Sequence, residues 1–155
     1  MKPIKRHNAL QSISHDHHQA LLVCWKIRMG LRKSIELQRI KRFCEFFYES
    51  HLADHFALEE EYLFPILGAR HELIIRALGD HHRLSQLFTQ KHVDVNILTR
   101  IEKELEEHVR FEERVLFREI QEKATEVQLN LVAAEYPGDK ENIKNIERWE
   151  DAFWL

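Results

Sequence analysis

Residues 55–67, HFALEEEYLFPIL, and residues 108–120, HVRFEERVLFREI, are two copies of one pattern. Aligned without gaps, they share a histidine, a pair of glutamates and a Leu-Phe at matching places. A shorter pattern, Asp-His-His, also occurs twice, at residues 16–18 and 80–82, and each time it precedes the longer one. This order indicates a duplicated helical hairpin whose matched residues are mostly of metal-binding types.

Length and composition agree with a single helical fold. The 155 residues include four glycines and three prolines, about a third of what average usage would give, so turns are few. Few turns, together with 32% charged and 44% hydrophobic residues, favour long helices over a many-stranded sheet. The net charge of −3 and the scattered lysines and arginines give no reason to expect nucleic acid as a partner.

Hydrophobic periodicity and its stop signals predict four long helices. The first has Ser12 or Ser14 as its N-cap and ends near Gly30, and Asp94 caps the last. The other three predicted helices span residues 35–64, 71–90 and 95–123. Because the connections are short, we expect an all-α, up-down-up-down antiparallel four-helix bundle.

The helical pattern weakens after Ala124, and Tyr136-Pro137-Gly138 is typical of a turn. Asp139 is the expected N-cap of a short last helix with apolar residues at helical spacing, namely Ile143, Ile146, Trp149 and Phe153. We therefore divide the chain into a bundle domain, residues 1–124, and a C-terminal extension, residues 125–155, that packs on it. The alternative is a tail that docks a partner, for which the sequence has no specific signal.

No feature of the sequence indicates export or a membrane. The first ten residues, MKPIKRHNAL, are basic but have no apolar stretch of signal-peptide length, and the longest apolar runs have six residues. Cys24 and Cys44 lie 20 residues apart in apolar surroundings without a Cys-x-x-Cys, which predicts reduced thiols. We therefore expect a cytoplasmic protein.

Both copies of the longer pattern place a glutamate four residues after a histidine, at His55 and Glu59 and at His108 and Glu112. The two side chains of a pair share one helix face, and each face is apolar, where a carboxylate is costly unless it is paired or bound to metal. One such pair alone is ordinarily a surface hydrogen bond, but two matched copies predict metal ligands. The following glutamates, Glu60 and Glu113, point about 100° further round the helix, so their replacement by alanine should cost far less metal than replacement of Glu59 or Glu112.

Periodicity also selects one histidine from each Asp-His-His. His17 and His81 share their faces with apolar residues, whereas His18 and His82 share theirs with polar ones. The two selected histidines and the two His/Glu pairs can meet at one level of the bundle core. His51, one turn before the first pair, is left open as a further ligand or as a group that orients one.

Four imidazoles and two carboxylates are too many ligands for one metal ion and suit two, with the carboxylates bridging. Two divalent ions bring four positive charges and the carboxylates return two negative ones, which favours a bridging oxide or hydroxide and open coordination positions. Nitrogen and oxygen ligands without thiolate suit iron. We therefore expect two iron ions in a non-haem di-iron centre, oxo- or hydroxo-bridged, that takes dioxygen, peroxide or nitric oxide.

The motifs DHH, HxxxEExxLFP, DHHRL and HxxxEERxLF, in this order, resemble the hemerythrin-like HHE cation-binding domain over about residues 8–123. The resemblance implies a four-helix bundle around a non-haem di-iron centre. The ferritin-like di-iron class is disfavoured, because its Glu-x-x-His motif occurs nowhere in the chain. By the resemblance the iron ligands are His17, His55, Glu59, His81, His108 and Glu112.

Two positions depart from the oxygen-carrying hemerythrins of that family. Ser85 stands where those proteins have a second histidine on the third helix. Glu112 lies four residues after the last histidine, where they have an aspartate at five. The set of four histidines and two glutamates is closer to members linked to iron sensing and to repair of damaged iron centres.

Three functions remain open at this stage. The first is a di-iron protein that binds or senses dioxygen, nitric oxide or cellular iron and redox state. The second is a di-iron enzyme in peroxide removal or iron-centre repair, although the sequence offers no acid–base pair beyond the ligands. The third is a metal-free helical interaction module. The sequence decides neither whether the protein is an enzyme nor which protein partner it has.

Overall fold

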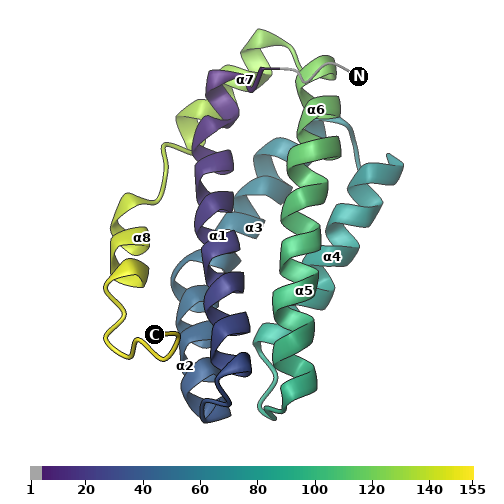
Figure 1. Cartoon of the computed structure of the whole chain (residues 1–155). Helices are drawn as coiled ribbons and strands as arrows, with labels where there is room; N and C mark the ends of the chain where they lie inside the picture. Colours follow the sequence, from purple (N-terminus) through teal and green to yellow (C-terminus); the bar gives the residue numbers. More distant parts are fainter. Residues whose placement is uncertain (1–4) are drawn as a thin grey trace.

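The computed structural model describes residues 5–155, which are largely helical and contain no strand. Long helical segments pack side by side as a bundle, with two shorter helices following along the outside (Figure 1). The predicted all-α class is confirmed. Residues 1–4, with which the predicted bundle domain begins, lie outside the described residues. Within the described part, no helix has both the length and the apolar content that a membrane crossing requires.

The first long segment is α1 (Asn8–Arg32). It begins four or more residues before the predicted serine caps, because the ring Nδ1 of His7 accepts the Ala9 N–H at 3.0 Å and so caps the first turn. The prediction of a serine N-cap was therefore wrong. The helix ends close to the expected place, and Ser34 follows with a φ of 55°.

The second long segment is continuous from residue 37 to residue 66, close to the predicted 35–64. Periodicity did not foresee that two of its turns are π-helical and that its last turn is a 3₁₀ helix that contains Pro65. The parts, in chain order, are α2 (Leu37–Phe47), η1 (Tyr48–Leu52), α3 (Ala53–Leu58), η2 (Glu59–Leu63) and η3 (Phe64–Ile66).

The third and fourth segments agree with the prediction to within two residues. The Asp94 carboxylate accepts the Ile97 N–H at 2.7 Å and caps the fourth segment, as expected. A third π-helical turn interrupts this segment. The elements are α4 (Glu72–Phe88), α5 (Val95–Phe111), η4 (Glu112–Leu116) and α6 (Phe117–Lys123).

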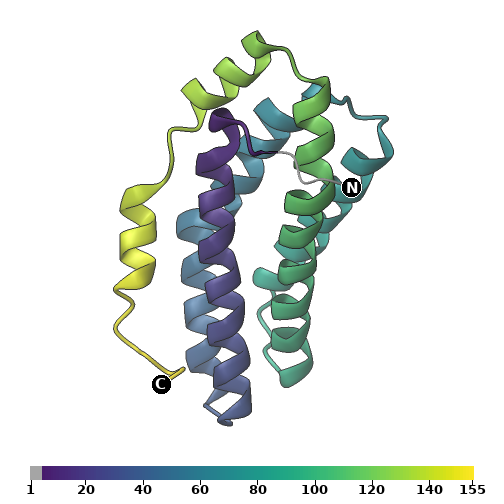
Figure 2. The ribbon, with the colours of Figure 1, turned by 45° about the horizontal axis from the view of Figure 1, so that its top comes forward.

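The rest of the chain contains two helices, α7 (Glu126–Glu135) and α8 (Lys140–Glu147). The sequence prediction missed α7, which starts at a capping box between Thr125 and Gln128. The predicted last helix was too long, because α8 ends before Trp149 and Phe153. Figure 2 shows α7 across one end of the bundle and α8 beside its flank.

The core consists of two apolar clusters separated by a polar layer. On α1 one cluster contains Ala9 to Ile13 and the other begins at Ala20, with His17 between them. The same order recurs on α4, where His81 lies between Ala77 and Leu84. The apolar clusters stabilise the bundle on both sides of this layer, and the layer contains the residues of the candidate site.

Candidate metal centre

The structure brings all six residues predicted as ligands into the polar layer. Their exposed fractions lie between 0% and 4%, although all six are polar or charged. His18 and His82 are exposed on the outside of the bundle, which agrees with the periodicity. Each long segment contributes at least one of the six: His17 from α1, His55 and Glu59 from the second segment, His81 from α4, and His108 and Glu112 from the fourth.

Both glutamates lie between two pairs of histidines. On one side, His17 Nε2 is 4.0 Å from Glu59 Oε2 and 3.9 Å from Glu112 Oε1. On the other side, His81 Nε2 is 3.2 Å from Glu59 Oε1 and 3.9 Å from Glu112 Oε1. His55 Nε2 completes the first side at 3.4 Å from Glu59, and His108 Nε2 contacts Glu112. The carboxylates thus have the position that bridging ligands between two ions would take.

Eight buried polar atoms of these six residues have no hydrogen-bond partner among the described residues. They are the Nε2 atoms of the four histidines and all four carboxylate oxygens of Glu59 and Glu112. Buried polar atoms in proteins nearly always have a partner, so eight without one at a single place call for a ligand. Imidazole nitrogens and carboxylate oxygens that face one another fit divalent metal ions.

The second ring nitrogen of every one of these histidines has a carboxylate partner. Such a hydrogen bond holds the ring so that its other nitrogen is directed to the centre. The four Nδ1–oxygen distances are 2.7 Å for His17 to Glu113, 2.9 Å for His81 to Glu60, 2.9 Å for His108 to Asp80 and 3.4 Å for His55 to Asp16.

The carboxylate partners follow the sequence repeat. The first half of the repeat comprises residues 16–18 and 55–67, and the second comprises residues 80–82 and 108–120. Asp16 and Asp80 each contact a histidine of their own half, His55 and His108. Glu60 and Glu113 each contact a histidine of the other half, His81 and His17. Glu60 and Glu113 thus contact two of the rings without belonging to the groups of donor atoms at the centre, a role that the sequence analysis did not foresee. The doubled glutamate in both copies of the pattern was the signal for this role.

Burial and the neighbouring carboxylates act in opposite directions on the histidines. Burial disfavours the charged ring of His55, but the carboxylates of Glu59, Asp16 and Glu112 together outweigh it and raise the pKa to about 10. In the same way, nearby carboxylates raise the pKa of buried His81 to about 11 and that of buried His108 to about 9. Burial opposes ionisation of Glu112, yet His108, Glu59 and His81 together hold its pKa well below the ordinary value. A metal ion would therefore displace protons from these rings.

Glu59 and Glu112 are each the first residue of a π-helical turn, η2 and η4. Single π-helical turns inside α-helices are rare and occur mostly at functional sites. Their presence at matching positions shows that the two copies of the pattern agree in backbone geometry as well as in residue type.

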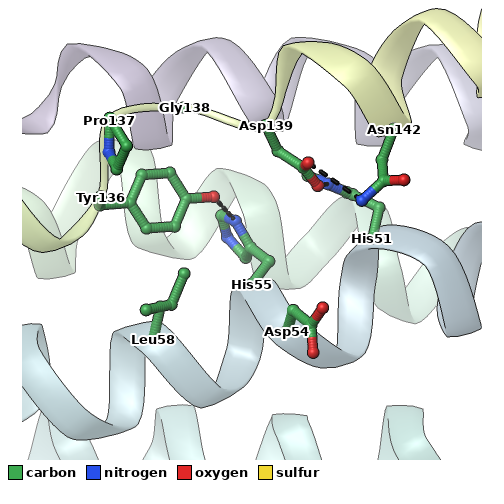
Figure 3. A pocket seen from close by; sticks show the side chains of 9 residues that line it. All are labelled: His51, Asp54, His55, Leu58, Tyr136, Pro137, Gly138, Asp139 and Asn142. Carbon is green, nitrogen blue, oxygen red and sulfur yellow. Dashed lines mark hydrogen bonds and ion pairs between the residues drawn. The ribbon is translucent and has the colours of Figure 1, made fainter.

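The C-terminal extension adds residues that the sequence did not associate with the site (Figure 3). The Tyr136 hydroxyl lies 2.5 Å from His55 Nδ1 and donates to Asp16. Asp139 makes no capping hydrogen bond to α8, against expectation, and its carboxylate instead lies 2.7 Å from His51 Nδ1. The turn at Tyr136 was expected, but its contact with the centre was not.

Comparison with known protein families gives a match. The model of the hemerythrin HHE cation-binding domain matches residues 8–120, which include all six residues of the polar layer. Neither the curated proteins nor the solved structures contain a match. Because the matched segment covers well over half of the chain, this chain belongs to the hemerythrin HHE cation-binding domain family.

Proposed function

We propose that this chain is a non-haem di-iron protein. One ion would be held by His17 and His55 and the other by His81 and His108. Glu59 and Glu112 would each supply a carboxylate to both ions. The observed groups of donor atoms support this division, because Glu59 belongs both to a group with His81 and His108 and to a group with His17 and His55.

The observation that carries the proposal is the set of eight buried donor atoms without a hydrogen bond. Leaving a buried polar group unsatisfied costs about 1–3 kcal/mol, and more for a charged one. In a metal-free interaction module, only ion pairs between these histidines and glutamates would offset this cost. Two cations among the donors would satisfy all eight atoms at once.

Iron suits the donor set better than metals that prefer sulfur. The six residues supply nitrogen and oxygen only. Cys24 and Cys44 are buried and unpaired by a disulfide, and burial raises the pKa of the Cys44 thiol to about 12. Neither thiol belongs to a group of donor atoms at the centre, so the described residues there supply no thiolate.

A small cavity beside the centre supports a role with a small ligand. Its volume of about 10 Å³ is about that of one water-sized molecule. Bound iron with an open coordination position would supply the site for dioxygen or nitric oxide, and the surrounding side chains would exclude larger molecules. We propose that the protein binds or senses such a ligand, or reports cellular iron and redox state. The apolar residues that line the cavity are Ala20, Leu52, Phe56, Leu105 and Val109.

Metal analysis with an optical spectrum tests the proposal. We expect two iron ions per chain and charge-transfer bands in the visible region that azide or nitric oxide perturbs. A single zinc ion per chain without visible absorption would overturn it. The response to dioxygen, nitric oxide and peroxide then separates a sensor from an enzyme, because an enzyme would turn peroxide over.

We also infer the direction of the four long segments and the division of the chain into a bundle domain and an extension. The short connections between the four long segments support an up-down-up-down antiparallel order. The contact of Tyr136 with His55 supports the view of residues 125–155 as an extension that packs on the bundle domain, residues 1–124. The cytoplasmic location stays a prediction from the cysteine pattern.

A further inference from the structure

A pocket of about 160 Å³ lies where the C-terminal extension crosses the second segment of the bundle (Figure 3). Two of the residues that line it, Asp54 and Asp139, carry carboxylates, and none is a lysine or an arginine. The side chains of His51 and His55 form part of its wall. The lining therefore favours a cation over an anion.

His51 and His55 also line the 10 Å³ cavity beside the centre. These two side chains thus separate the outer pocket from the inner cavity. A second pocket, of about 270 Å³, reaches the other half of the centre, but it shares only His108 with the inner cavity. Its lining combines two arginines with three carboxylates, namely Arg76, Arg83, Asp80, Glu104 and Glu107. The two guanidinium groups offset two of these three carboxylates, whereas no lysine or arginine offsets the two carboxylates of the first pocket.

Asp16, His51 and His55, which we call the outer cluster, offer donor atoms that lie within 4.8 Å of one another. Asp16 and His51 are each only 2% exposed. His51 Nε2 is 4.0 Å from Asp16 Oδ2, too far for a hydrogen bond but the same separation as between His17 Nε2 and Glu59 Oε2 in the centre. An ion with bonds of about 2.0–2.2 Å fits between the two atoms.

His55 belongs to both sets of donors. Its Nε2 faces Glu59 in the centre, and its Nδ1 faces Asp16 in the outer cluster. The Tyr136 hydroxyl, which donates to Asp16 and lies beside His55, holds these two side chains together when no ion is present. The outer cluster is therefore directly adjacent to the centre, with one imidazole between them.

We propose that the outer cluster is a transient binding site for a divalent cation, through which ions pass from the pocket into the centre. This inference rests on the proposed function. Asp139 and Asp54 attract the ion to the pocket, and Asp16 and His51 then bind it. Two protein ligands with water hold an ion more weakly than the six residues of the centre, which suits transfer inward.

The rate of metal loading tests this inference. Metal-free protein is mixed with Co²⁺ in a stopped-flow instrument, and the cobalt absorption bands report arrival in the centre. We expect His51→Gln and Asp139→Asn to load roughly ten-fold more slowly, at the lower end of the range for electrostatic steering, with an unchanged final number of ions. Glu107→Gln, which removes a carboxylate from the second pocket, is the matched control and should load at the wild-type rate.

Ionic strength gives a second readout of the same experiment. Salt screens exposed carboxylates, so wild-type loading should slow as salt is added, and the dependence should be weaker in Asp139→Asn. Equal loading rates in the wild type and both variants would overturn the inference. A lower final number of ions at an unchanged rate would also overturn it, since His51 would then only position a ligand. A wild-type chain that binds no metal would instead refute the proposed function itself.

Discussion

The centre has two halves, one with His17 and His55 and the other with His81 and His108. They arise from copies of one sequence pattern, yet their surroundings differ. In the second half, His108 Nδ1 lies 2.9 Å from Asp80, which also pairs with the exposed Arg83, and a pocket opens to solvent beside them. In the first half, the C-terminal extension covers the equivalent residues His55 and Asp16. The repeat therefore accounts for the inner residues, and segments outside it make the halves unequal.

Tyr136 has a direct effect on the first half. Its hydroxyl lies between His55 and Asp16, so the distance from His55 Nδ1 to Asp16 is 3.4 Å, the longest of the four such contacts. A ring that interacts with a neutral phenol is a weaker electron donor to a metal than one that interacts directly with a carboxylate. We therefore expect the ion beside His55 to be bound differently from the ion beside His108.

The largest effect is expected from the two glutamates that serve both halves. Glu59→Ala or Glu112→Ala removes a carboxylate that lies near histidines of both halves, so metal content should fall in both halves at once. Metal analysis of the purified variants measures the loss. Glu61→Ala, at an exposed position two residues after Glu59, should keep the wild-type content. Equal loss in Glu61→Ala would contradict the assignment of the centre.

Metal removal should destabilise the whole bundle, because all four long segments supply ligands. A ligand present at 100 times its dissociation constant stabilises the folded state by about 2.7 kcal/mol. We expect chelation to lower the Tm measured by circular dichroism and re-addition of iron to restore it. An unchanged Tm would favour the metal-free interaction module.

Replacing the aspartate of one half should weaken mainly the ion of that half. Loss of such a hydrogen-bond partner typically costs 10–100-fold in metal affinity. We expect Asp80→Asn to be more severe than Asp16→Asn, since Tyr136 still holds His55 in the latter. Competition with a chromophoric chelator measures both affinities. The opposite order would show that Tyr136 does not support the first half.

The smallest effect is expected from Tyr136→Phe, which keeps the ring and removes the hydroxyl. The change removes a net hydrogen-bond contribution of about 0.5–1.5 kcal/mol, and only the first half should respond. Denaturant unfolding and metal affinity measure it. Tyr48→Phe is the matched control, because Tyr48 stacks on Phe88 away from the centre. Equal effects of the two variants would refute the special role of Tyr136.

The sequence predicted the start of a helix well where a strong N-capping residue precedes it. Asp94 preceded a helix that begins at Val95, as expected, because a cap depends on residues within one turn. The π-helical turns at Glu59 and Glu112 were not foreseen, since a periodicity of 3.6 residues assumes a regular helix. Helix α7 was missed because its apolar pattern is weak, although Thr125 and Gln128 mark its start.

The amino-acid sequence alone determined which six side chains meet inside the bundle. Residues four apart on a helix share a face, and the repeat marks the same face twice. Only the tertiary structure decided what surrounds them. Tyr136 lies 81 residues from His55 and 120 from Asp16 along the chain, and Asp139 lies 88 from His51. Helical periodicity relates residues within a few turns, so contacts between such distant segments depend on how the whole chain packs.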